Sequence, residues 1–277
     1  AVLNKILKDK KKLKNISIFF IDLPKWFCKE TQNWNSLKKK KFLEQIIKEP
    51  DLHIVFKNNQ LLQKFNLSNV KTSEKSVMVK HPENINKLPY YNNGYWWVQD
   101  MATMLPIHLE KNIQNKSILD MCAAPGGKAF QILSVESSVQ MVDINKFRVI
   151  KLNENLKRLK YNNKAIVQDS LKINNNKKYD MIILDSPCSS VGTIRRNPEI
   201  FFRNSNPNFE SLTLLQKKLL DKAKELLKKK GVIMYMVCSF LDIETISQIN
   251  FFLLKNSNFV VEKIISQNKN FNNLIDK

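Results

Sequence analysis

The chain has 277 residues, of which 43% are hydrophobic and 26% charged, as expected for a globular protein with one large core and a smaller second domain. No apolar run approaches the roughly 18 residues of a membrane helix and no signal peptide is apparent, so we expect a cytoplasmic protein without membrane contact. The formal net charge of +21 favours a polyanionic partner such as RNA, although a general bias toward Lys, Asn and Ile would produce the same excess.

The first fifty residues are predicted to be helical, in segments 1–13, 23–34 and 35–50, with prolines at two of the boundaries. Because the chain does not begin with methionine, we expect it to be part of a longer protein. Residues 51–95 read as a small α+β module: the alternation in "DLHIVFKNN" and "KSVMVKH" predicts two strands, and "NQLLQKFNL" between them predicts a short helix. An aromatic, turn-rich joint around Gly94 closes this module.

Beyond the joint, Asp100 is a suitable cap for a helix that begins at the next residue. Strand and helix patterns then alternate, which predicts a parallel sheet covered on both faces. The long helical pattern that starts at residue 211 is expected to end at Gly231. The predicted strands are residues 117–120, 139–143, 165–168, 181–185, 232–237 and 259–264.

A glycine pair, Gly126 and Gly127, follows the first of these strands within "CAAPGGK". Since the chain has only five glycines, the pair indicates a tight turn that lets a nucleotide-like cofactor approach the backbone, and an ordinary strand-to-helix turn is the alternative. The turn is not a P-loop, because Ala129 replaces the magnesium-binding Ser or Thr, and the absence of GxGxxG disfavours NAD.

Acidic residues follow the next two strands. Asp143 lies at the distance from the glycines at which a carboxylate binds a ribose diol, and Asp169 is placed to accept a hydrogen bond from an adenine amino group. Either one alone would more often be a loop acid or a helix cap. Together with the glycine turn they favour an adenosyl site beyond the carboxyl ends of the strands.

Two of the four cysteines end strands near this site, Cys188 directly after Pro187 and Cys238 after the strand at 232–237. The cysteines show no CxxC spacing and the three histidines are scattered, so we expect reduced thiols and no metal site. Both thiols are candidate nucleophiles, and spacing alone does not separate them. Small buried packing residues are the alternative for any free cysteine.

The segments "DMCAAPGGK", "DSPCSSVGTIRRNPE" and "VCSF" resemble, in this order, the motifs of the Sun family of RNA (cytosine-5) methyltransferases. "GYWWVQDMAT" resembles the family's entry to the catalytic domain, and "AVLNKILK" resembles the last helix of the NusB-like domain in its bacterial 16S rRNA member. The resemblance covers nearly the whole chain. It implies an α/β fold with a Rossmann-like S-adenosylmethionine-dependent methyltransferase sheet, preceded by an RRM-like module and N-terminal helices.

In this family carbon-5 of cytosine is methylated after a thiolate has added to carbon-6. The resemblance implies that Cys238 is the nucleophile, that Cys188 assists its release, and that Asp185 contacts the base edge. We expect nearby positive charge from Arg195, Arg196 and the cofactor sulfonium to lower the pKa of the nucleophile. The Cys122 thiol itself is expected to serve in packing. The implied S-adenosylmethionine site comprises Cys122, Ala123, Ala124, Pro125, Gly126, Gly127, Lys128, Asp143, Asp169 and Asp185, and the implied RNA contacts are Lys128, Arg195 and Arg196.

The expected organisation is a helical remnant of a NusB-like domain at 1–50, a small RNA-binding module at 51–95 and a catalytic domain at 96–277. Val237 replaces the family's threonine, and the glycine-and-aromatic strand that usually completes the fold is not found, so the catalytic domain is expected to lack its last strand. We expect a monomer that methylates bacterial 16S rRNA. A tRNA cytosine-5 methyltransferase and a non-catalytic RNA-binding assembly factor are the alternatives.

Overall fold

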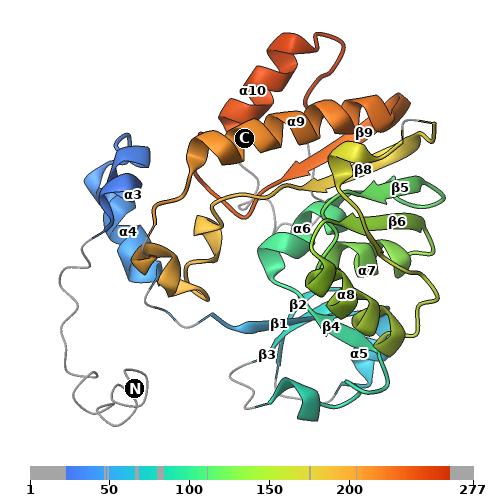
Figure 1. Cartoon of the computed structure of the whole chain (residues 1–277). Helices are drawn as coiled ribbons and strands as arrows, with labels where there is room; N and C mark the ends of the chain where they lie inside the picture. Colours follow the sequence, from blue (N-terminus) through green and yellow to red (C-terminus); the bar gives the residue numbers. More distant parts are fainter. Residues whose placement is uncertain are drawn as a thin grey trace, which may run out of the picture.

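The structure is a computed structural model that describes residues 23–46, 48, 50–65, 69–79, 84–110, 112–174, 176–203 and 205–262 (Figure 1). The predicted helix at 1–13, which includes the segment resembling a NusB-like domain, lies outside the described residues. The helices predicted in segments 23–34 and 35–50 are confirmed as α3 (Lys25–Glu30) and α4 (Ser36–Ile46). No helix in the described part of the chain combines the length and apolar character that crossing a bilayer requires.

A parallel five-stranded sheet forms the centre of the molecule and confirms the predicted α/β fold. Its strands are β5 (Ser117–Asp120), β6 (Ser138–Asp143), β7 (Ile166–Val167), β8 (Tyr179–Asp185) and β9 (Leu227–Met236). They are arranged in the order β7-β6-β5-β8-β9. The order reverses between β5 and β8, and ligands of such sheets bind outside the carboxyl ends of the strands at this point.

Alternate residues of the strands face two different layers of helices, because successive side chains of a strand point to opposite faces. Ile118 and Met181 belong to the core under α6 (Met101–Leu109), α7 (Gly127–Leu133) and α8 (Lys146–Arg158). Their neighbours Leu119 and Ile182 belong to the core under α9 (Phe209–Leu226) and α10 (Ile246–Lys255). Figure 1 shows the two layers on opposite sides of the sheet. Both faces are therefore covered, as the alternation of strands and helices predicts.

A second, antiparallel sheet with the order β2-β3-β1-β4 lies beside the first one. It contains β1 (Leu52–Phe56), β2 (Asn69–Ser73), β3 (Ser76–Val79) and β4 (Trp96–Val98), with α5 (Asn59–Gln63) between β1 and β2 and the 3-10 helix η1 (Ile85–Lys87) before β4. The predicted strand, helix and strand are present as β1, α5 and β3, whereas β2 was not predicted. The fourth strand of this sheet, β4, comes from residues just beyond the domain boundary predicted at residue 95.

Strand β4 joins the two parts because its two tryptophans face different cores. Trp96 is fully buried among the side chains of the small sheet, whereas Trp97 is buried in the core under α6 and α7. Each indole nitrogen donates a hydrogen bond, Trp96 to the Pro89 carbonyl at 2.8 Å and Trp97 to Gln99 at 2.8 Å. Their role is therefore packing between the two modules.

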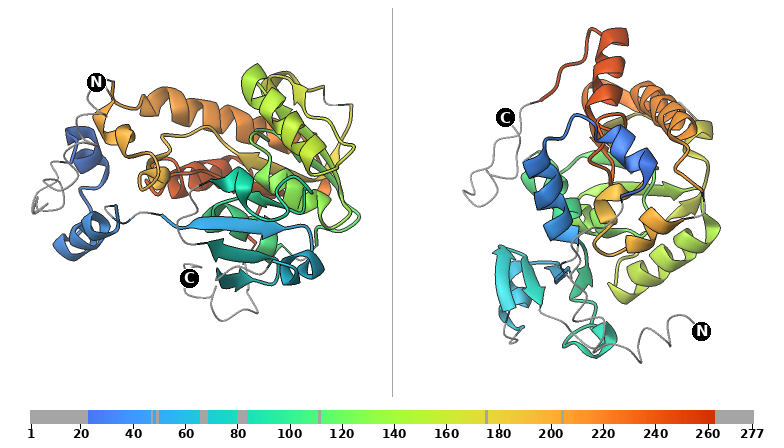
Figure 2. Two further views of the ribbon diagram at one scale, coloured as in Figure 1. Left: turned by 90° about the horizontal axis from the view of Figure 1, so that it is seen from below. Right: turned by 90° about the vertical axis from the view of Figure 1, so that its left-hand side faces the viewer.

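The N-terminal helices pack, through an aromatic cluster, against the part of the chain that carries the parallel sheet. Phe27 of α3 is fully buried and lies 4.8 Å from the ring of Phe201 and 5.2 Å from that of Phe42. Phe201 belongs to the 3-10 helix η4 (Pro198–Phe202) in the loop that follows β8. The second panel of Figure 2 shows α3 and α4 beside this loop. A segment distant in sequence thus supports the loop that carries the motif "DSPCSSVGTIRRNPE".

Two predicted elements differ in the structure. The helix expected to reach Gly231 ends at Leu226, and Gly231 lies in β9, where a Cβ atom would come within 2.9 Å of the Asp180 carbonyl oxygen. Residues 259–262 of the last predicted strand are not in a strand, and 263–264 lie outside the described residues. Phe259 instead packs against Phe252 of α10, with ring centroids 5.1 Å apart, so its apolar side chain covers a helix rather than joining the sheet.

Candidate active site

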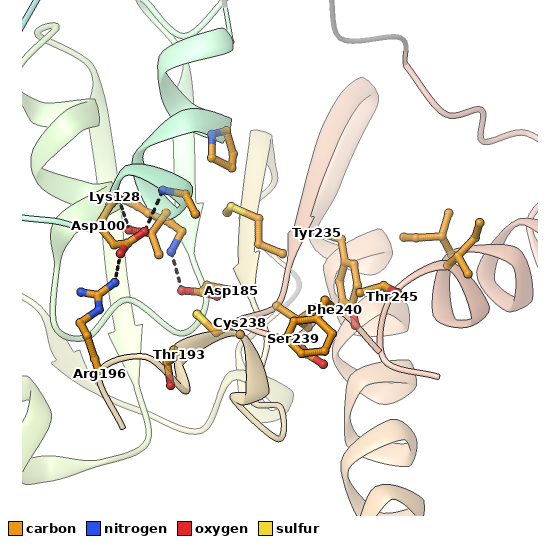
Figure 3. A pocket seen from close by; sticks show the side chains of 18 residues that line it. Asp100, Lys128, Asp185, Thr193, Arg196, Tyr235, Cys238, Ser239, Phe240 and Thr245 are labelled. Carbon is orange, nitrogen blue, oxygen red and sulfur yellow. Dashed lines mark hydrogen bonds and ion pairs between the residues drawn. The ribbon is translucent and has the colours of Figure 1, made fainter. Parts of the chain in front are cut away.

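A cavity of about 510 Å³ opens at the carboxyl ends of β8 and β9 (Figure 3). One side is polar, with Lys128, Asp185 and Cys238 close together. The other side is largely apolar and includes Tyr235 and Phe240. Its size is within the range of small-ligand sites, so a nucleoside-sized group fits it. The remaining lining residues are Asp100, Ala102, Thr103, Pro106, Gly192, Thr193, Arg196, Met236, Val237, Ser239, Thr245, Ile246 and Ile249.

The glycine turn positions Lys128 in the first turn of α7. Gly126 has φ 110°, which residues with a side chain rarely adopt, and a Cβ atom there would lie 2.3 Å from the Leu152 side chain. The chain therefore turns sharply from β5 into α7 and buries Lys128 to 9% exposure. Its ammonium Nζ lies 2.5 Å from Asp185 Oδ2 at the end of β8. This ion pair connects the start of α7 to the end of β8.

Cys238 is half-buried and lines the cavity beside this ion pair. Burial raises the pKa of the Cys238 thiol, the Asp185 carboxylate raises it further, and Lys128 and Arg196 lower it. The expectation that the site lowers this pKa is therefore wrong for the chain by itself, because burial outweighs the two cations. Arg196 acts in the expected direction, whereas Arg195 is not among the groups that shift this pKa.

Cys188 does not line the cavity but lies in the loop behind Cys238. Two backbone hydrogen bonds join the loops, from the Ser186 amide to the Met236 carbonyl at 2.8 Å and from the Gly192 amide to the Cys238 carbonyl at 3.0 Å. Burial is the main cause that raises the pKa of Cys188 to about 12. Both thiols thus belong to one neighbourhood, and only one faces the cavity.

The two adjacent arginines point to different places. Arg196 is paired with Asp100 in the cavity, where Asp100 also accepts a hydrogen bond from the Ala102 amide at 2.8 Å and so caps α6 as predicted. Arg195 is exposed and its Nε donates to the Lys48 carbonyl at 3.2 Å, at the end of the N-terminal helical segment. Of the predicted RNA contacts, Lys128 and Arg196 therefore line the cavity and Arg195 does not.

The predicted adenosyl contacts lie at the neighbouring strand ends. Asp143 is buried, and its carboxylate accepts hydrogen bonds from the Ala124 amide at 3.2 Å and the Asn145 amide at 2.9 Å. Asp169 caps the 3-10 helix η2 (Ser170–Lys172) through the Leu171 amide at 3.0 Å. Neither lines the cavity, nor do Cys122, Ala123, Ala124, Pro125, Gly126 and Gly127.

Asp120, at the end of β5, is a buried acid that the sequence analysis did not single out. Among the described residues neither carboxyl oxygen has a hydrogen-bond partner of normal geometry. Burial raises its pKa to about 7, Lys128 opposes this shift and Asp185 reinforces it. Burial also raises the pKa of Cys122, and this side chain packs against the core under α9 and α10, in agreement with the expected packing role.

Other groups of the site also carried no functional prediction. Asp100 was predicted as a cap only, and nothing in the sequence distinguishes Tyr235, Phe240 or the buried Glu244 from ordinary core or surface residues. Within the ranges that the structure describes, His, Cys, Asp and Glu side chains form no group of three that would hold a metal ion.

Known proteins resemble this chain over the part that carries the parallel sheet. A family model described as 16S rRNA methyltransferase RsmB/F matches residues 106–274. The ribosomal RNA small subunit methyltransferase B of Photorhabdus laumondii is 37% identical over 190 residues, which cover 67% of this chain and 44% of that protein. Its counterpart in Shewanella oneidensis is 34% identical over 200 residues, which cover 70% and 47%. The chain thus spans about half the length of these curated relatives.

Solved structures share the fold. The crystal structure of NSun6 from Pyrococcus horikoshii with SFG superposes with a TM-score of 0.72 at 17% identity and covers 84% of this chain and 87% of that one. A methyltransferase homologue from the same organism gives a TM-score of 0.64 at 22% identity, with 84% and 83% covered. The family match over more than half of the chain confirms the predicted resemblance: this chain belongs to the RsmB/F family of 16S rRNA methyltransferases, within the Sun type.

Proposed function

We propose that this chain methylates carbon-5 of a cytosine in RNA, with Cys238 as the nucleophile and S-adenosylmethionine as the methyl donor. The observation that carries the proposal is the position of Cys238, whose thiol faces a nucleoside-sized cavity together with Lys128 and Asp185. The names of the curated relatives, ribosomal RNA small subunit methyltransferase B, support 16S rRNA as the substrate.

The cavity provides what the reaction requires of the protein. In the first step the Cys238 sulfur forms a bond to carbon-6, and the electron pair of the carbon-5 to carbon-6 double bond becomes available at carbon-5 for attack on the methyl group. In the second step a base takes the carbon-5 proton, the electron pair of that carbon–hydrogen bond restores the double bond, and the sulfur of Cys238 leaves as a thiolate with the electron pair of the carbon–sulfur bond. Because burial and Asp185 raise the pKa of Cys238, the thiol needs a base or an added cation to ionise at neutral pH.

The Lys128 and Asp185 pair provides charged hydrogen-bonding groups at the base edge. Asp185 is partly exposed, with 26% of its side chain accessible, so a carboxylate oxygen is available to a cytosine amino group. Lys128 and Arg196 place positive charge near Cys238 and stabilise the thiolate. Cys188, behind the nucleophile in the joined loops, is proposed to assist its release.

The residues present fit S-adenosylmethionine. Asp143 and Asp169 at the ends of β6 and β7 provide carboxylates for ribose hydroxyls and an adenine amino group, and the glycine turn from Cys122 to Lys128 provides backbone amides and an ammonium. When bound, the cofactor supplies an electrophilic methyl group and a positive sulfonium. The protein's own part is to hold the cytosine between Cys238 and the methyl group and to exclude water.

The remaining expectations belong to the same proposal. We propose a cytoplasmic, monomeric protein organised as a helical segment at 1–50, an RNA-binding module at 51–95 and a catalytic domain at 96–277. The formal net charge of +21 supports an RNA partner, because such a charge attracts phosphate and makes binding fall steeply with salt. Asp100, paired with Arg196 at the cavity, adds a polar group for the RNA that the sequence did not indicate.

The test is transfer of a tritiated methyl group to unmodified 16S rRNA and to tRNA transcripts. We expect incorporation into 16S rRNA at carbon-5 of cytosine, and we expect Cys238→Ala to abolish transfer while cofactor binding, measured by calorimetry, stays unchanged. Transfer retained in Cys238→Ala would refute the assignment of the nucleophile. Incorporation into tRNA alone would favour the tRNA enzyme, and RNA binding without incorporation would favour a non-catalytic assembly factor.

A further inference from the structure

Glu244 is a fully buried acidic residue close to both reactive thiols, and the proposed mechanism does not use it. It lies six residues after Cys238, in the turn that leads into α10. Its carboxylate accepts three hydrogen bonds from uncharged groups: the Ser189 amide at 2.8 Å, the Ser189 hydroxyl at 2.5 Å and the Gln216 side-chain amide at 3.3 Å. Burial of a carboxylate among neutral donors is costly, so its position calls for a specific role.

These hydrogen bonds hold the loop on both sides of Cys188. Ser189, the residue after the cysteine, is tied to Glu244 through its amide and its hydroxyl. Pro187, the residue before it, accepts a hydrogen bond from the Gln216 side chain at 3.0 Å. Gln216, on α9, is itself fully buried. Cys188 is therefore fixed between two anchored neighbours.

The same acid is fixed relative to the Cys238 loop. The Tyr235 hydroxyl on β9 donates to the Glu244 carbonyl at 2.8 Å, and the Glu244 amide donates to the Leu241 carbonyl at 3.0 Å. The Cys238 amide lies within hydrogen-bonding reach of the Cys188 sulfur and lowers the pKa of that thiol. Displacement of Glu244 would consequently change the position of Cys188 relative to Cys238.

We propose that Glu244 is a positioning residue that, together with Gln216, clamps the Cys188 loop against the Cys238 loop so that the release thiol stays beside the nucleophile. This inference rests on the proposed function, because it gives Cys188 its place in the release step. Glu244 touches neither reacting atom and acts through Ser189.

The charges around Cys188 agree with this role. Burial raises the pKa of Cys188, the Ser190 and Cys238 amides lower it, and Glu244 and the Cys238 thiolate raise it. The pKa of Tyr235, which also packs here, is raised by burial and by the nearby Cys188 and Glu244. A negative charge behind Cys188 favours its protonated form. Removal of that charge is therefore expected to make Cys188 a stronger nucleophile as well as a more mobile one.

Alkylation by iodoacetamide tests the clamp without RNA or cofactor. Four versions of the full chain are exposed to iodoacetamide: the wild type, Glu244→Gln, Glu244→Ala and the control Gln248→Ala. The control removes a buried side-chain amide that donates to the Ile243 carbonyl at 2.8 Å. Peptide mass spectrometry gives the rate at each cysteine. Cys28 is exposed and serves as the internal standard, and the partly buried Cys122, which packs against the core under α9 and α10, reports unfolding.

We expect the rate at Cys188 to rise in Glu244→Ala, by about tenfold for each pKa unit that the thiol recovers, and to rise less in Glu244→Gln, which keeps the shape and one acceptor. Rates at Cys122 and Cys238 should change little, as should all rates in Gln248→Ala. An unchanged rate at Cys188, or equal acceleration of Cys122 and Cys188 in both Glu244 variants, would overturn the clamp.

A second measurement separates this proposal from the proposed function. With 16S rRNA transcript and S-adenosylmethionine, Glu244→Ala is expected to accumulate a covalent RNA adduct that denaturing gels resolve, because a displaced Cys188 releases the product slowly. Faster alkylation of Cys188 without an adduct supports the clamp and refutes the release role of Cys188. Unchanged alkylation of Cys188 refutes the clamp whatever the RNA result.

Discussion

The buried carboxyl group of Asp120 predicts an unusual dependence of stability on pH. Asp120 is 1% exposed at the end of β5, and burial raises its pKa from 3.8 to about 7. Because the pKa in the folded chain lies above the unfolded value, the protonated group favours folding at low pH, and this stabilisation is lost as the pH rises toward 7. Asp120→Asn removes the titration and leaves the shape of the side chain.

The magnitude follows from the shift. The rise from 3.8 to about 7 corresponds to a loss of at most about 4 kcal/mol of unfolding free energy once Asp120 is ionised in the fold. About 2–3 kcal/mol of this loss falls between roughly pH 5 and pH 8. Over that interval the wild-type chain should lose stability relative to Asp120→Asn. The asparagine carries its own burial cost, but that cost does not depend on pH.

Urea unfolding followed by tryptophan fluorescence across this pH range measures the difference. Asp180→Asn is the matched control, because Asp180 accepts hydrogen bonds from the Ser117 amide at 2.9 Å and from Lys228 at 3.0 Å, which lower its pKa. The stability due to Asp180 is lost only as the pH falls through its lowered pKa, so this variant should run parallel to wild type over the same interval. Parallel curves for Asp120→Asn and wild type would refute the assigned pKa.

Three further changes test the site. Gly126→Ala should lower the unfolding free energy by about 2–5 kcal/mol, because φ of Gly126 is 110° and a Cβ atom there would lie 2.3 Å from another side chain. Gly127, where φ is not positive, is the control, and an equal loss in Gly127→Ala would contradict this reasoning. Lys128→Met should shift the pH profile of Cys238 alkylation to higher pH because a cation that lowers this pKa is lost, and a downward shift would contradict this reasoning. Cys188→Ala should slow turnover and trap a covalent RNA adduct, whereas normal turnover without an adduct would argue against its release role.

The sequence predicts the site where backbone topology alone brings residues together. Parallel strands end at one edge, so the residues after β5, β8 and β9 meet there whatever their side chains, and Lys128, Asp185 and Cys238 lie in one cavity as expected. The direction of each loop side chain depends on distant contacts instead. Arg195 and Arg196 are adjacent in sequence, yet a carbonyl at Lys48 holds one outside while Asp100 draws the other into the cavity.

Burial is the property that single-sequence patterns conveyed least. Asp120 precedes the glycine turn and Glu244 follows Cys238 in a polar stretch, and both resemble exposed acids until the fold places helices over them. The sign of the pKa shift at Cys238 was missed for the same reason. Counting nearby cations predicts a lowered pKa for Cys238, but the desolvation that outweighs them depends on how completely the folded chain encloses the thiol.

The neighbours of the two thiols give a physical reason to assign them different roles, which their spacing in the sequence does not. Cys238 faces the cavity and the cations Lys128 and Arg196, so any further positive charge brought there by a cofactor acts on this thiol first. Cys188 lies behind it, next to the Glu244 carboxylate, in surroundings that favour the protonated form. These surroundings agree with the proposed roles, because Cys238 can reach a cytosine bound in the cavity and Cys188, which is held in its protonated form, lies beside it.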